Sequence, residues 1–182
     1  MLSTVPFLSH LRRPGPLAAA LLACALAACS PVFNWREVPF DGELTLLLPC
    51  KPDRAQRTLP LGEAAVPLDM IGCEAGGATF ALARLPAGDP AQARLRAEAW
   101  RAAARRPWAG AQLSEAPITL PRAAEAPAPV ELVAHGPAAE ARMRWFAHAD
   151  ARGALTLYQA TVLGRPSEAD AAATFFEGLK LR

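Results

Sequence analysis

The sequence lacks the short motifs that mark the common catalytic sites. It contains no GxSxG serine, no HExxH helix, no P-loop and no GxGxxG turn. It also lacks an apolar run long enough for a permanent membrane span, because residues 17–28 would cover only about 18 Å as a helix. Distant residues can still converge on a site, so these absences lower the expectation of an enzyme without excluding one.

A basic excess is missing as well. The 19 Lys and Arg outnumber the 17 Asp and Glu only through Arg12 and Arg13, so the chain beyond residue 28 is neutral. Nucleic acid is therefore not an expected partner, since phosphate neutralisation needs clustered basic residues. Much of the 52% hydrophobic content is alanine, so the 182 residues support one modest core.

Residues 1–28 have the order of a secretory signal, in which a basic pair precedes an apolar run and small residues. Twin-arginine export is an alternative that fits poorly, because Pro14, Gly15 and Pro16 follow the arginines. The run ends in the tetrad Leu26-Ala27-Ala28-Cys29, which resembles the lipobox of bacterial lipoproteins.

The lipobox resemblance implies cleavage before Cys29 and acylation of its thiol, and two or more acyl chains anchor a protein stably to a bilayer. In such lipoproteins a residue like Ser30 accompanies sorting to the outer membrane, which predicts a periplasm-facing protein at that membrane. An ordinary signal peptide with an incidental cysteine is the alternative.

The two remaining cysteines of the mature chain, Cys50 and Cys73, are predicted to form a disulfide, because an even pair in an oxidising compartment favours one. A metal pair or a redox couple is the alternative. Neither fits the spacing well, since the pair is not CxxC and only His135 and His148 remain as imidazole ligands. We therefore assign no metal and no cofactor.

Residues 29–40 are expected to be a lipidated tether, and residues 41–182 a single domain. The tether's aromatic residues, Phe33, Trp35 and Phe40, are expected to pack on the edge of the domain. An interfacial anchor near the lipid headgroups is the alternative.

Within 41–182 the hydrophobic pattern predicts antiparallel strands and two helices. Short runs separated by tight turns such as Gly76-Gly77 favour antiparallel pairing. The sequence therefore predicts an α+β domain, an antiparallel β-sheet with a helix packed on one or each face. The expected strands are 43–48, 55–61, 66–73, 78–85, 111–120, 130–135, 140–148 and 154–163, and the expected helices are 91–106 and 167–178.

Helix 91–106 has clear start signals, because Asp89 can cap it and Pro90 suits its first position. Its apolar stripe includes Ala93, Ala97 and Trp100, and its arginines are expected to form a solvated face, with a membrane or polyanion surface as the alternative. In the last helix, Ser167 and Asp170 approximate a capping box, and Gly178 is expected to stop the helix.

This layout resembles the PsbP/Mog1-like fold. The resemblance rests on DGELTLLLPCKP at 41–52, the helix at 91–106, the Tyr-bearing strand at 154–163 and the paired aromatics at 174–179. LLPCKPDR at 47–54 is also similar to a segment of proteobacterial lipoproteins of undefined function. The resemblance implies an α/β/α sandwich used for binding or assembly, and it transfers no catalytic residue.

Two histidines, His135 and His148, are candidate catalytic or ligand residues. We interpret His135 as an ordinary hydrogen-bonding residue at a strand end, and His148 with Asp150 as turn polarity.

Three charged residues form the remaining candidate. Glu140, Arg142 and Arg144 would suit a carboxylate or phosphate through guanidinium forks, or cross-strand charge pairs on an exposed face.

The sequence thus predicts a non-catalytic lipoprotein of the bacterial envelope, a binding or assembly module held at the membrane through its lipid and working with an envelope protein. An envelope hydrolase or transferase with an unrecognised site, and a purely structural envelope component, are the alternatives.

Overall fold

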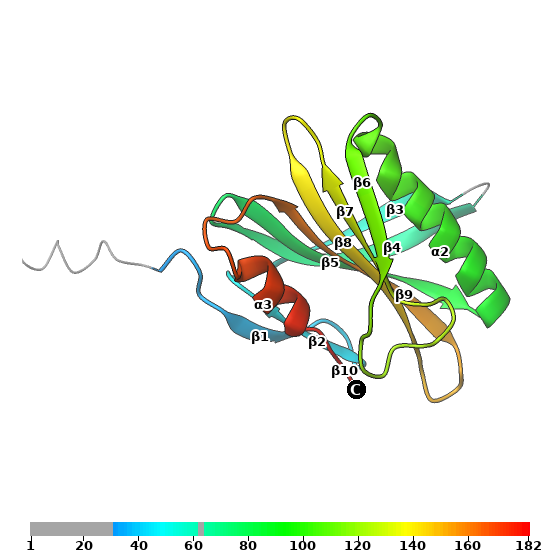
Figure 1. The fold of residues 1–182 in the computed structure, drawn as a ribbon. Coiled ribbons are helices and arrows are strands. Elements are labelled where there is room, and N and C mark those ends of the chain that lie inside the picture. Colours follow the sequence, from blue (N-terminus) through cyan, green and yellow to red (C-terminus); the bar gives the residue numbers. More distant parts are fainter. Residues whose placement is uncertain (1–30, 62–63) are drawn as a thin grey trace, which may run out of the picture. The chain divides into compact units, whose positions relative to one another are not determined.

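A computed structural model describes residues 31–61 and 64–182 (Figure 1). The expected signal segment 1–28 and Cys29 lie outside these described residues. The description below concerns the unit Val32–Arg182. Within the described residues, no helix is both long and apolar enough to cross a membrane.

The largest element is an antiparallel sheet of seven strands in the order β3-β4-β5-β9-β8-β7-β6, and a second sheet has the order β1-β2-β10. The α+β class and the antiparallel pairing are thereby confirmed. The strands and helices are β1 (Arg36–Pro39), β2 (Leu44–Leu48), β3 (Asp53–Leu61), β4 (Ala64–Ala75), β5 (Ala78–Gly88), α2 (Pro90–Arg105), β6 (Gln112–Pro117), β7 (Val130–His135), β8 (Glu140–Ala149), β9 (Leu155–Gly164), α3 (Ala171–Glu177) and β10 (Lys180–Leu181).

Local turn chemistry fixes two of the hairpins. Gly76 and Gly77 join β4 to β5 with φ angles of 57° and 80°, the left-handed values that a two-residue hairpin turn requires. Between β8 and β9 the Asp150 carboxylate accepts hydrogen bonds from the backbone N–H groups of Arg152 and Ala154. Both turns were expected from the sequence.

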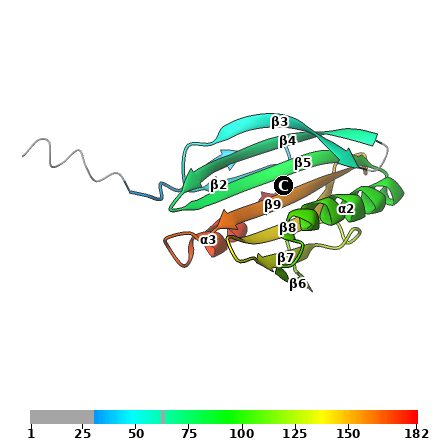
Figure 2. The same ribbon diagram turned by 90° about the horizontal axis from the view of Figure 1, so that it is seen from above.

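The seven-stranded sheet carries a hydrophobic core on each face, because alternate residues of a strand point to opposite sides. Leu85, Met143 and Trp145 belong to the core under α2. Phe80, Phe146 and Tyr158 belong to the core under α3 and the small sheet. Figure 2 shows α2 in front of the large sheet and β2 and α3 behind it.

Helix α2 forms as predicted. It begins after Asp89, whose carboxylate accepts a hydrogen bond of 2.9 Å from the backbone N–H of Gln92. Ala93, Ala97 and Trp100 are its buried residues, so the predicted apolar stripe is the face that packs on the sheet.

The start of the domain differs from the expectation. Residues 36–39, expected to be tether, form β1, and the strand expected at 43–48 pairs with β1 and β10 instead of joining the large sheet. The physical reason is burial, since Phe33 and Phe40 are each only 8% exposed in the core under α3. The expected packing of these aromatics on the domain is confirmed.

The last helix is shorter than expected, and the proposed capping box is wrong. The backbone N–H of Ser167 donates to the carbonyl of Gly76, and Asp170 makes no capping hydrogen bond with its side chain. Helix α3 ends at Glu177, with Gly178 as its C-cap, and a Cβ at Gly178 would lie 2.6 Å from Cβ of Leu47. After Gly178 the chain continues into β10, a strand of two residues that pairs with β2 and that the sequence did not indicate.

Candidate binding groove

A groove with a volume of about 780 Å³ opens where the end of α3, strand β10 and the loop after β6 come together. The small sheet contributes Glu37 and Thr45, and β8 contributes Arg144. Its size falls within the ordinary range of small-molecule sites. Its apolar lining includes Leu120, Pro121, Phe176, Leu179 and Leu181.

The charged residues of the groove are mostly basic. Four basic side chains line it against two acidic ones, Glu37 and Glu177. Glu37 is neutralised by an ion pair of 2.9 Å with Lys180. The basic residues are Arg122, Arg144, Lys180 and Arg182.

Arg144 belongs to a cluster with a neighbouring strand. Glu131 on β7 accepts a hydrogen bond of 2.7 Å from Nε of Arg144. Its two carboxylate oxygens lie 3.0 and 3.2 Å from one Nη of Arg142, which donates to them. Both guanidinium groups lie over the ring of Phe176, at 5.4 Å for Arg142 and 4.3 Å for Arg144. Cross-strand pairing, one of the two interpretations of these arginines, is confirmed.

Two hydrogen bonds of Arg122, one from its side chain and one to its backbone carbonyl, fix the loop that carries it. Its Nη1 donates to the carbonyl of Leu181 at 3.2 Å, and its own carbonyl accepts 3.0 Å from Nδ1 of His148. Nε2 of His148 lies 3.5 Å from a carboxylate oxygen of Glu43. Turn polarity was therefore the wrong account of His148, which is only 9% exposed and fixes the loop from within β8.

The other candidate residues lie elsewhere. His135 is exposed at the end of β7, with Nδ1 at 3.8 Å from Glu140. Glu140 accepts 2.9 Å from Arg165, and this hydrogen bond lowers the pKa of the Glu140 carboxyl. Of the candidate residues, only Arg144 lines the groove, and His148 fixes the loop that lines it.

A second polar cluster joins the small sheet to the large one. Asp41 accepts a hydrogen bond of 3.0 Å from the Tyr158 hydroxyl and one of 2.8 Å from Arg84. Arg84 also forms an ion pair of 3.1 Å with Asp69. Burial by itself lowers the pKa of Arg84, but the charges and hydrogen bonds of Asp41 and Asp69 raise it by more, so the pKa of Arg84 is raised overall. Beside it lies a hollow of about 380 Å³.

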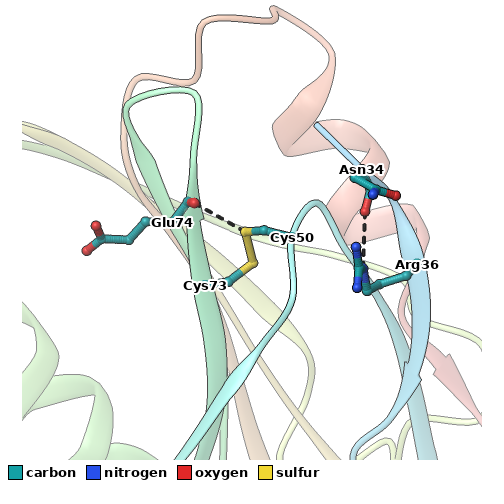
Figure 3. Close-up of a disulfide and its surroundings, with 5 residues drawn as sticks. All are labelled: Asn34, Arg36, Cys50, Cys73 and Glu74. Carbon is teal, nitrogen blue, oxygen red and sulfur yellow. Dashed lines mark hydrogen bonds between the residues drawn. A yellow bond between two sulfur atoms is a disulfide. The ribbon is translucent and has the colours of Figure 1, made fainter. Parts of the chain in front are cut away.

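The predicted disulfide is present between Cys50 and Cys73, with Cα atoms 5.9 Å apart (Figure 3). Cys50 follows β2 and Cys73 lies in β4, so the bond links the two sheets. Sγ of Cys50 lies 3.3 Å from the carbonyl oxygen of Glu74.

Sequence reasoning missed Glu131, Arg122 and Phe176. The alternation of β8 placed Arg142 and Arg144 on one face, and a short hairpin to β7 would have set Glu131 opposite them. The sequence carried no signal that Arg122 or Phe176 would meet that face.

No group of three or more His, Cys, Asp or Glu within residues 31–61 and 64–182 has the geometry to hold a metal ion. No protein-family model matches the chain, and no curated protein matches it either.

Proposed function

We propose that this chain is a membrane-anchored, non-catalytic binding module of the bacterial envelope, with a PsbP/Mog1-like fold. The groove beside α3 is its binding site. The observation that carries this proposal is the groove itself, about 780 Å³ of space with an apolar lining and a mainly basic set of charges.

Three of the basic groups of the groove are held in place by the fold, which supports a binding role. Arg144 is engaged with Glu131, Lys180 with Glu37, and Arg122 with a backbone carbonyl. These three basic side chains are therefore already oriented by the fold, as a preformed binding site requires.

In this proposal the lipid on Cys29 holds the module at the outer membrane, facing the periplasm. The disulfide supports an oxidising compartment of this kind. An envelope protein that supplies or receives the ligand of the groove belongs to the same proposal.

The anchor is tested by labelling cells with palmitate and fractionating their envelopes. We expect the wild-type chain to carry the label and to sediment with membranes, and Cys29→Ser to lose both properties. Cys24→Ser is the matched control, because this cysteine lies in the segment that is cleaved off in this proposal. An unlabelled wild-type protein, or a Cys29→Ser variant that still sediments with membranes, would refute the anchor.

A further inference from the structure

We propose that the groove binds an amphiphile that carries a carboxylate or phosphate group on an apolar chain, with Arg144 contacting the anionic group. This inference rests on the proposed binding function and specifies the chemistry of its ligand. It is carried by the charges, hydrogen bonds and apolar lining described below.

The cluster behind the groove has a surplus of positive charge. Arg142 and Arg144 share a single carboxylate, that of Glu131, whose side chain is 16% exposed. One negative charge therefore faces two positive ones. Of the two arginines only Arg144 lines the groove.

Arg144 is held in a position that suits anion binding. Its Nε donates to Glu131, and its guanidinium lies 4.3 Å from the centre of the Phe176 ring. These two contacts fix the plane of the group without using its Nη atoms. A planar guanidinium with free Nη groups forms paired hydrogen bonds with a carboxylate or phosphate.

The hollow beside Arg84 provides a useful contrast. Its volume is about 380 Å³, and Arg84 there pairs with two carboxylates, those of Asp41 and Asp69. The charge of Arg84 is thus already compensated, and Arg54, which also lines this hollow, donates to the backbone carbonyls of Phe40 and Pro39. Counted together, two arginines face two carboxylates, so this cluster has no surplus of positive charge. The larger groove combines the uncompensated charge with apolar walls.

The backbone beside the groove favours a small ligand over an added peptide strand. Strand β10 is an edge of the small sheet, but the carbonyl of Leu181 accepts a hydrogen bond from Arg122. An incoming strand would have to displace that bond. The apolar chain of an amphiphile instead fits against Leu120, Phe176 and Leu179.

The test is a titration of the full chain, monitored by calorimetry and by amide chemical shifts, with four probes of equal chain length below their micelle concentrations. The probes are decanoate, decyl phosphate, decanol and decyltrimethylammonium. We expect both anions to bind and to shift amides of the 119–122 loop and of 176–182, with decanol at least tenfold weaker. The ratio of decanoate to decyl phosphate affinity then distinguishes a fatty-acid source from a phosphate-headgroup source.

Arg144→Gln is expected to weaken binding of the anions tenfold or more and to leave decanol binding unchanged. The fold should persist, because Glu131 keeps Arg142 as its partner. Arg142→Gln is the matched control. It removes one guanidinium from the same carboxylate, Glu131, but Arg142 does not line the groove. We expect it to weaken anion binding less than Arg144→Gln does, because it removes the surplus charge beside Glu131 but keeps the guanidinium that contacts the anion.

Several results would overturn the inference. Equal losses of anion affinity in Arg144→Gln and Arg142→Gln would mean that the anion responds only to the total positive charge and does not contact Arg144. Tighter binding of decanol or of the cation in the groove would leave a binding module with a different ligand class. Absence of any shift in the groove with all four probes would refute this ligand class, whereas failure of the membrane anchor is determined separately with Cys29→Ser.

Discussion

At the scale of single residues, Asp41 shows how one carboxylate organises distant parts of this chain. Its Oδ1 accepts hydrogen bonds from the backbone N–H groups of Glu43 and Leu44, which shape the turn into β2. Its Oδ2 accepts from Arg84 and Tyr158 on the large sheet. The side chain is 8% exposed, so these partners replace the water that a buried carboxylate needs.

The Tyr158 hydroxyl gives a pH prediction. Burial, reinforced by the negative charge of Asp41, raises the pKa of Tyr158 above its ordinary value of 10.0. The unfolded chain then loses the phenolic proton at a lower pH than the folded chain. We expect this group to stabilise the fold fully below about pH 10, and the free energy of unfolding to fall by about 1.4 kcal/mol per pH unit above it.

This prediction can be followed on one chromophore, because Tyr158 is the single tyrosine of the sequence. Phenolate absorbance should appear only as circular dichroism reports unfolding. The control Tyr158→Phe keeps the ring and should lose this alkaline dependence. Phenolate formation near pH 10 in a protein that remains folded would contradict the prediction.

At the scale of elements, α2 shows a helix whose sequence signals and tertiary contacts agree. Its cap, its proline at the start and its buried stripe were all visible in the sequence. Helix α3 shows the opposite case. Its seven residues are too few for a stable isolated helix, and Phe175 and Phe176, which are 0% and 1% exposed, hold it against the sheet.

Two substitutions on α2 test this account of its packing. Trp100 is 3% exposed, so Trp100→Ala should lower the free energy of unfolding by about 3–5 kcal/mol through lost contacts and a cavity. Leu95 is 63% exposed on the same helix, and Leu95→Ala should change stability by no more than about 0.5 kcal/mol. Urea denaturation of both variants measures the difference, and similar losses would contradict the packing described here.

At the scale of the whole folded unit, the two sheets are joined by packing and by one covalent bond. The small sheet packs Leu44, Leu46 and Leu48 against the large one, and all three are fully buried. The disulfide links Cys50 to Cys73 at a sequence separation of 23 and closes the segment that contains β3 and most of β4. Reduction of this bond gives the unfolded chain more freedom than it gives the packed one.

We expect reduction to lower the free energy of unfolding by about 3.4 kcal/mol, the chain-entropy value for a loop of this length. Denaturant titrations with and without reductant measure the loss. The double variant Cys50→Ser/Cys73→Ser should unfold at the same denaturant concentration under both conditions. A wild-type protein whose stability is indifferent to reductant would contradict the prediction.

Prediction from the sequence worked where contacts are local. The β4–β5 and β8–β9 hairpins depend on turn residues between adjacent strands, such as Gly76 and Asp150. It failed for β1, β10 and the groove, because Glu37, Arg144 and Leu181 come together from separate parts of the chain. A strand of two residues such as β10 has no periodicity to recognise.

The sequence by itself determined the α+β class, the antiparallel hairpins and helix α2, since alternation, turn residues and caps act over short distances. It also predicted the pairing of Cys50 with Cys73, which the structure contains. Only the tertiary structure decided that β2 pairs with β1 and β10 and not with the large sheet. It also decided that Arg144 shares Glu131 with Arg142, and that Arg144 lines a groove. The physical reason is that burial of the aromatic residues around α3 selects contacts between distant segments, and no short stretch of sequence encodes which segments those are.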